Sequence, residues 1–229
     1  MQCKKINDIC IKLKKYFLIN QNIKYSIVSF ETFNNFYSKY FLIMSCDIHL
    51  RIEQRKRVNP YPNDRHDWYN VGFYGEFSNR IYGMFTRMAK VRDYYVDKYN
   101  VQFEPRGLPD DMTDGATCES FYLHVTDDEA AVDGGEHYCL KEMAEKWVEQ
   151  GYSKWVNENH TRITNPDHHS HSWLTTQELR QCFDDCFKQE DGTYIPNSDY
   201  VEWLGLVSLC EGIESDGIHE CRVVFAFDN

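Results

Sequence analysis

The sequence predicts one domain of the α+β or α/β class over residues 44–229. The segment 46–53 alternates between apolar and polar residues, and the segment 221–227 is an apolar run rich in β-branched and aromatic residues, so both predict strands. Between them, apolar residues recur at helical spacing in several segments. This arrangement favours a central sheet that contains the first and last strands, with about four helices packed around it.

Residues 1–43 differ in composition from the rest of the chain. They contain seven Lys and two acidic residues, and they lack Gly, Pro, Ala and Arg. The missing residues have GC-rich codons, whereas the abundant Lys, Asn, Ile, Tyr and Phe have AT-rich codons, which indicates a non-native upstream extension with Met44 as the native start. The alternative is a disordered, basic amphipathic arm that contacts a membrane or a partner. In either case we expect no functional site there.

The first strand predicted after Met44 is half-buried. In "CDIHLRIE", residues 46–53, the apolar side chains share one face, and the polar side chains, which include Asp47 and His49, share the other. Residues 55–75 contain two prolines and several turn residues, which predicts a loop with a short strand near 68–73.

The middle of the domain predicts a helix, a stiff loop, a strand and a second helix. Helical spacing of apolar residues predicts a long helix over 77–95, and the prolines and glycine of 104–115 predict an ordered, turn-rich loop. Alternation predicts a strand over 119–126, followed by an acidic turn at 127–135 and a helix over 136–150.

The last third contains the clearest helix start. Thr175 and Glu178 form a T-x-x-E capping box ahead of an apolar stripe that extends to Phe187. The histidine-rich residues 168–171 are therefore expected on the loop that enters this helix. A further helix is predicted over 198–209, and the terminal strand over 221–227 is expected at the centre of the sheet because it is apolar on both faces.

Composition excludes several classes of protein. The net charge of −11 and the pI near 5.3 disfavour binding to duplex nucleic acid. No apolar stretch is long enough to span a membrane, and no secretory leader is evident at the N-terminus, so no membrane partner is expected. The nine cysteines are odd in number and form no C-x-x-C pair, which favours a reducing compartment such as the cytoplasm.

Two pairs of residues are candidates for a metal site. Asp47 and His49 on the first strand, with His169 and His171 on the histidine loop, could supply nitrogen and oxygen ligands for zinc, manganese or iron. Similar D-x-H and H-x-H pairs occur in calcineurin-like metallophosphoesterases, but the other metal-binding segments of that family are absent here, so two metals are not supported. The alternative is that the histidines are ordinary surface residues.

Two further patterns suggest phosphate chemistry. Arg106, in a loop stiffened by prolines, could hold a phosphate or carboxylate with two hydrogen bonds, or it could be neutralised by Asp110 or the following aspartate. The H-x-T segment at His124 matches one half of the two-histidine phosphoesterase pattern, whereas the histidine loop only imitates the other half.

Four segments together resemble a family of uncharacterised bacteriophage and prophage proteins: "CDIH", "RGLPDD", "HSHSWLT" and the terminal "RVVFAFDN". The similarity extends in order from Met44 to the C-terminus and does not cover residues 1–43. It implies a phage origin, the cytoplasm of a bacterial host as location and a shared pocket, but it brings no established activity. The residues that the resemblance singles out are Asp47, His49, Arg106, Asp110, His169, His171, Trp173, Arg222 and Asp228.

We therefore expect one pocket, formed by the first strand, the Arg106 loop and the histidine loop, that binds a phosphorylated small molecule such as a nucleotide, either with or without its hydrolysis. In that pocket, His169 or His171 would be the general acid or base, Asp47 would orient His49, and Arg106 would stabilise the phosphate. The remaining predicted contacts to the ligand come from Asp110, Trp173, Arg222 and Asp228. Two alternatives remain: a metal-dependent phosphoesterase that uses zinc or manganese, and an acidic module that binds a host protein without catalysis.

Overall fold

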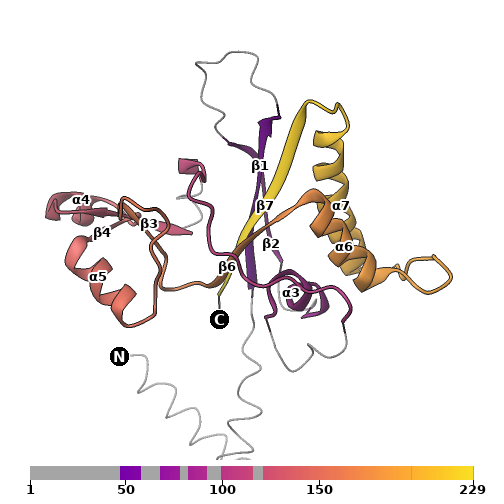
Figure 1. The fold of residues 1–229 in the computed structure, drawn as a ribbon, viewed down its shortest axis with the longest axis horizontal. Helices are drawn as coiled ribbons and strands as arrows, with labels where there is room; N and C mark the ends of the chain where they lie inside the picture. Colours follow the sequence, from indigo (N-terminus) through magenta and orange to yellow (C-terminus); the bar gives the residue numbers. More distant parts are fainter. Residues whose placement is uncertain are drawn as a thin grey trace, which may run out of the picture. The chain divides into compact units, whose positions relative to one another are not determined.

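A four-stranded antiparallel sheet lies at the centre of the fold (Figure 1). Its strand order is β2-β1-β7-β6, where β1 spans Asp47–Lys56, β2 Tyr69–Phe77, β6 His169–Thr175 and β7 His219–Asp228. The structure is a computed structural model, and it describes residues 47–57, 68–77, 82–91, 99–115, 121–196 and 198–228. The predicted α+β domain, with its first and last strands paired inside one sheet, is confirmed.

Three helices cover one face of this sheet. They are α3 (Tyr82–Ala89), α6 (Thr176–Phe187) and α7 (Ser198–Glu214). Six strand residues on this face are fully inaccessible to solvent in β1 and β7, and they are Ile48, Leu50, Ile52, Val223, Phe225 and Phe227. Because each large apolar side chain that is buried contributes about 1.5–3 kcal/mol, this layer is the principal hydrophobic core.

The polar face of β1 is buried at Arg51 and Glu53 and partly exposed at Asp47 and His49, which corrects the prediction of a half-buried strand for its central part. A second layer covers it, in which Leu108, Met112, Phe121 and Tyr122 pack with Val224 and Ala226 of β7. Under this layer, the Glu53 carboxylate accepts hydrogen bonds from Arg222 Nε at 2.7 Å and from the Thr113 N–H at 3.0 Å. Glu53 and Arg222 are 0% and 4% exposed, and each neutralises the charge of the other.

A smaller sheet has the strand order β4-β3-β5, made of Tyr138–Leu140, Tyr122–Thr126 and Arg162–Thr164. The helices α4 (Glu129–Gly134) and α5 (Lys141–Glu149) contact it. The helix predicted over 136–150 is wrong in its first part, because residues 138–140 pair with β3 instead. The predicted acidic turn contains the short helix α4. Asp128 caps the N-terminus of this helix, because its side chain accepts a hydrogen bond from the Ala130 N–H.

The histidine-rich segment is a strand, not the predicted loop. Residues 169–175 pair with β7 and form one edge of the central sheet. The capping box that follows is confirmed: the Thr175 side chain accepts a hydrogen bond from the Glu178 N–H, and the Glu178 carboxylate accepts one from the Thr175 N–H at 2.9 Å. The strand was missed because polar and apolar residues do not alternate simply along it.

The long helix predicted over 77–95 is confirmed only for residues 82–89, which form α3: Phe77 belongs to β2, and the helix ends before Lys90, which takes a left-handed φ of 52°. The flanking segments 78–81 and 92–98 lie outside the described residues, and so do residues 1–43, for which we predicted an extension or arm. Within the described ranges, no helix combines the length and the apolar character that crossing a membrane requires.

Candidate metal centre

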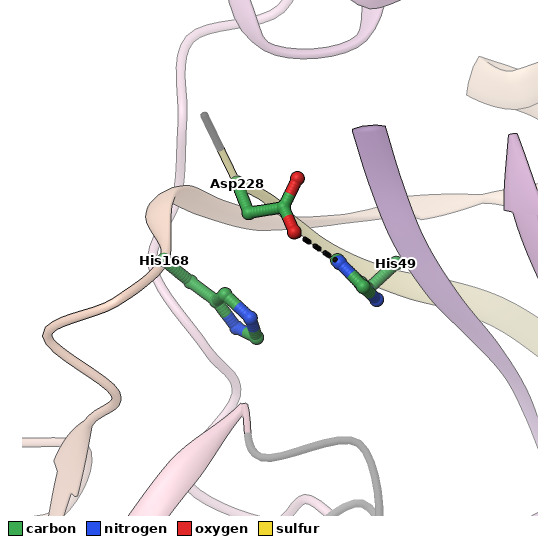
Figure 2. A group of neighbouring side chains, drawn as sticks. All are labelled: His49, His168 and Asp228. Atoms are coloured by element: carbon green, nitrogen blue, oxygen red, sulfur yellow. Dashed lines mark hydrogen bonds and ion pairs between the residues drawn. The ribbon is translucent and has the colours of Figure 1, made fainter. Parts of the chain in front are cut away.

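Three side chains that could bind a metal meet at one end of the central sheet (Figure 2). They belong to His49, His168 and Asp228, and one potential ligand atom from each lies within 4.8 Å of the other two. His49 Nε2 is 2.9 Å from Asp228 Oδ2, and the His168 ring stacks on the His49 ring with 5.0 Å between centroids. Two imidazoles and a carboxylate are a common three-residue ligand set for catalytic zinc and for iron(II).

Strand pairing brings His49 and Asp228 together. In the β1–β7 register, Asp47 is opposite Asp228 and His49 is opposite Ala226, so His49 and Asp228 are diagonal neighbours on the same face. The Asp47 N–H also donates a hydrogen bond of 3.3 Å to Asp228 Oδ1, which helps to orient the carboxylate. The predicted partner of His49 was Asp47, but the residue that orients the imidazole is Asp228.

A tight turn delivers His168 to the same place. The Asn165 carbonyl accepts a hydrogen bond from the His168 N–H at 3.2 Å, and the Asn165 side chain accepts one from the Asp167 N–H at 3.0 Å. His168 Nδ1 is buried and has no hydrogen-bond partner among the described residues. A buried imidazole nitrogen without a partner is unusual, and it is a ready metal ligand.

The distances suit one ion after a small adjustment. Two ligand atoms that each lie about 2.1 Å from one zinc ion are separated by roughly 3–3.5 Å, depending on the coordination angle. The 2.9 Å between His49 Nε2 and Asp228 Oδ2 is close to this separation. The His168 ring would have to approach by about 1–2 Å, which a change of side-chain torsion can supply.

The electrostatics favour the metal-binding protonation states of His168 and Asp228. Burial, together with the nearby His49, lowers the pKa of His168, so its imidazole is neutral at pH 7. For Asp228, burial acts to raise the pKa, but the hydrogen bond and charge of His49 outweigh it and the pKa is lowered. A neutral imidazole and an ionised carboxylate are the forms that bind metal.

A β-bulge separates the other two histidines. Ser170 has a left-handed φ of 51°, and the β6–β7 register shifts between His169 and Ser172. As a result, the His169 ring stacks on Phe227, which belongs to the core on the helix side, while the His171 ring lies 6.2 Å from that of His168. The two histidines therefore do not form the predicted pair of metal ligands, because a bulge changes the alternation of side chains and sends the two rings to different surroundings.

His171 is the most deeply buried of these histidines, at 8% exposed. Its Nε2 atom has no hydrogen-bond partner within the described part of the chain. Burial, reinforced by the nearby His168, His169 and Lys154, lowers its pKa to about 3, so it is a neutral imidazole at physiological pH.

A small cavity of about 180 Å³ lies beside the three-residue cluster and shares His168 with it. Its polar wall contains Ser153, Lys154, Thr164, His168, His169 and His171. The Lys154 side chain is exposed and pairs with no carboxylate among the described residues. None of the described residues that line this cavity is acidic, although the chain has 36 Asp and Glu against 25 Lys and Arg.

A larger cavity of about 780 Å³ is lined by three of the predicted ligand-binding residues, Asp110, Trp173 and Arg222. Its arginines are already paired with carboxylates of the protein. Arg222 binds Glu53 and Asp111 and lies 4.0 Å from the centre of the Trp68 ring, while Arg55 pairs with Glu220. Although this cavity is the larger one, its cations are therefore engaged and its walls are partly acidic, so it is a weaker candidate for an anion site.

Arg106 lines neither of these two cavities. Its guanidinium pairs with both oxygens of Glu178 and lies 4.8 Å from the centre of the Trp173 ring. Arg106 does bind a carboxylate with two hydrogen bonds, as we predicted from its position in a loop stiffened by prolines. The carboxylate is that of the capping box, however, and not that of Asp110 or the following aspartate.

The predicted residues therefore do not line a single pocket. Of the four predicted metal ligands, only His49 belongs to the cluster, which is completed by Asp228, predicted as a ligand-binding residue, and by His168. His168 could have been predicted as a candidate ligand from the sequence, since it is the first histidine of "HHSH". Lys154 carried no signal, because a single exposed lysine is common. The two-histidine motif fails as well, since His124 packs against Tyr122 and Tyr138 of the smaller sheet.

Comparisons with protein-family models, with curated proteins and with solved structures find no match to this chain. The candidate site therefore rests on the chemistry of its own residues: two imidazoles and a carboxylate that converge beside a cavity without acidic groups.

Proposed function

We propose that this protein is a metal-dependent hydrolase of the phosphoesterase type that acts on a small phosphorylated molecule, with nucleotides among the candidates. The observation that carries the proposal is the convergence of His49, His168 and Asp228. Three protein ligands leave coordination positions open for water and substrate, as catalytic metal sites do. The resemblance to phage proteins adds the proposal that it acts as a phage accessory protein in the cytoplasm of a bacterial host.

The chemistry that a zinc ion supplies at such a site is a bound water with a pKa near 7. In hydrolysis, the water oxygen forms a bond to phosphorus, the ester P–O bond breaks, and the water proton passes to the leaving oxygen. His171 lines the adjoining cavity, where its neutral imidazole can carry that proton. Arg106 cannot stabilise the phosphate while it is bound to Glu178.

Metal titration tests the proposal. The full chain, freed of metal, would be titrated calorimetrically with zinc, manganese and iron(II), and then assayed for phosphate release from phosphomonoesters and nucleotides. We expect His49→Ala, His168→Ala and Asp228→Asn each to weaken metal binding at least tenfold and to abolish phosphate release. The control is His160→Ala, because this exposed histidine stacks on Trp155 and lies outside the cluster.

Unchanged metal affinity in all three ligand variants would contradict the metal site. Metal binding without phosphate release from any substrate would contradict the proposed hydrolase activity, but it would support the metal site. In the first case, the acidic protein-binding module becomes the better hypothesis.

A further inference from the structure

We propose that the small cavity is the subsite for the phosphoryl group of the substrate, held between the Lys154 ammonium group and the His171 ring beside the metal centre. This inference rests on the proposed function and goes beyond it, because it assigns the part of the substrate that is recognised and two residues that recognise it. The three metal ligands alone do not predict a role for Lys154 or for the cavity.

The charge of the cavity is the first argument. Lys154 brings a positive charge to a wall that contains three histidines and no carboxylate, in a protein whose net charge is −11. In the larger cavity, by contrast, Arg55, Arg57 and Arg222 are matched by four acidic residues. An anion is therefore attracted to the smaller cavity, where a positive charge has no partner among the described residues.

The unsatisfied imidazole is the second argument. His171 is 8% exposed, and its Nε2 atom lacks a hydrogen-bond partner among the described residues although the residue lines the cavity. A buried polar atom without a partner is destabilising, and a ligand that forms a hydrogen bond with it would remove that cost. Because the other ring nitrogen is directed to the Phe121 backbone, Nε2 of the neutral ring is an acceptor, and a protonated phosphoryl oxygen can donate a hydrogen bond to it.

The size of the cavity is the third argument. At about 30 Å³ per water molecule, 180 Å³ corresponds to roughly six waters. That space accepts a phosphoryl group and a few more atoms, whereas sites that enclose a whole ligand commonly measure about 300–1,000 Å³. The subsite therefore holds a terminal phosphate, and the rest of the substrate stays outside the cavity.

The position of the cavity links it to the metal centre. His168 lines the cavity and also belongs to the three-residue cluster, so a phosphoryl group in the cavity would lie next to the ion. The bulge at Ser170 is what places His171 near His168 instead of beside His169. A strained backbone at this point is consistent with a binding role.

Binding of inorganic phosphate to the zinc-loaded full chain tests this inference. Calorimetry would compare the wild type with Lys154→Met and His171→Phe, and with Lys146→Met as the matched control. Lys146 is an exposed lysine of α5 that lies outside the cavity, so its substitution changes the net charge equally. We expect Lys154→Met to weaken phosphate binding roughly tenfold and His171→Phe about fivefold or more, while Lys146→Met has less than a twofold effect.

Zinc affinity is measured for each variant in the same series. If the zinc affinity of Lys154→Met stays within twofold of the wild type, the variant is folded and its metal centre is intact. A loss of phosphate binding in this variant then reports on the subsite alone. This holds even if His171→Phe fails to fold. Phosphate binding that is equally strong in Lys154→Met and in the wild type would overturn the subsite and leave the metal centre standing. If zinc does not bind to the wild type at all, the proposed function fails, and the same phosphate titration of the metal-free chain then tests the cavity alone.

Discussion

His168, His169 and His171 are close neighbours in sequence but have different surroundings. His168 stacks on His49 beside Asp228, His169 packs on Phe227, and His171 is buried against the cavity. The imidazole is the same in each case, so the chemical role of each ring depends on burial and on neighbouring charge. Only the first of the three has a potential ligand atom within 4.8 Å of a carboxylate and a second imidazole.

The buried His171 should make the metal-free protein sensitive to mild acid. Burial, with the nearby His168, His169 and Lys154, lowers its pKa to about 3, whereas the pKa of histidine in an unfolded chain is about 6.5. Between these values the unfolded chain binds a proton that the folded chain does not, so the free energy of unfolding falls as the pH falls. The slope from this residue is at most about 1.4 kcal/mol per pH unit.

Urea unfolding from pH 8 to pH 4 would measure this effect in the wild type and in His171→Gln. We expect the difference in unfolding free energy between the two proteins to be constant above about pH 7 and to change in favour of the variant at lower pH. A difference that does not vary with pH would show that His171 does not remain neutral in the folded protein.

The edge strand β6 is where local conformation decides the geometry of the site. It begins at the bulge formed by Ser170, continues through Trp173 and Leu174, and ends at the capping box of Thr175. The Arg106 loop is attached to this strand, because the Gly107 N–H donates a hydrogen bond of 2.9 Å to the His171 carbonyl. One strand thus positions the cavity, the start of α6 and the Arg106 loop.

The positive φ at Ser170 predicts how this strand tolerates substitution. Glycine adopts φ near 51° without the steric cost that a Cβ brings, so Ser170→Gly should preserve or raise the free energy of unfolding by up to about 1 kcal/mol. Ser170→Val should lower it by about 1–3 kcal/mol, because a β-branched residue is poorly tolerated there. Chemical denaturation measures both, and zinc affinity reports whether the bulge persists.

Equal stability of Ser170→Val and Ser170→Gly would contradict the bulge. Ser170→Ala is a useful third variant, since it removes the hydroxyl that lies 3.0 Å from His169 Nδ1 while it retains a Cβ.

The fold as a whole consists of a central sheet with a different layer on each face. The helix side is a continuous apolar core, whereas the other side contains buried ionic groups that attach the 105–115 segment to the sheet. Arg222 connects Glu53 of the neighbouring strand to Asp111 of that segment. Hydrophobic burial therefore supplies most of the stability, and the ion pairs fix how the second layer is aligned.

Removal of Glu53 should test this alignment. Glu53→Ala leaves the Arg222 guanidinium buried without its carboxylate and removes the acceptor for Thr113, so we expect a loss of about 3–5 kcal/mol in the free energy of unfolding. The control is Glu104→Ala, since its pair with Lys90 is exposed and should contribute less than about 1 kcal/mol. A loss below 1 kcal/mol for Glu53→Ala would show that the buried network is not important for stability.

Sequence patterns were sufficient for most elements. The alternation of 46–53, the apolar run of 221–227 and the capping box at Thr175 depend on residues close together in the chain, and the structure has all three features where they were predicted. Such patterns reflect the period of a strand or a helix, which the local sequence sets directly. The same local information identified the histidine cluster as a candidate for a site, whereas Asp228 was singled out only by the resemblance to phage proteins.

The composition of the site depended on tertiary structure. His49 meets Asp228 because of the register between two strands at opposite ends of the domain, and His168 reaches them through a turn that the sequence did not reveal. The bulge at Ser170 directs the His169 and His171 rings to different surroundings. Glu178 pairs with the Arg106 guanidinium, which is then not available to a ligand. Register, bulges and ion pairs between distant segments result from packing across the whole domain, so the spacing of residues along the chain cannot specify them.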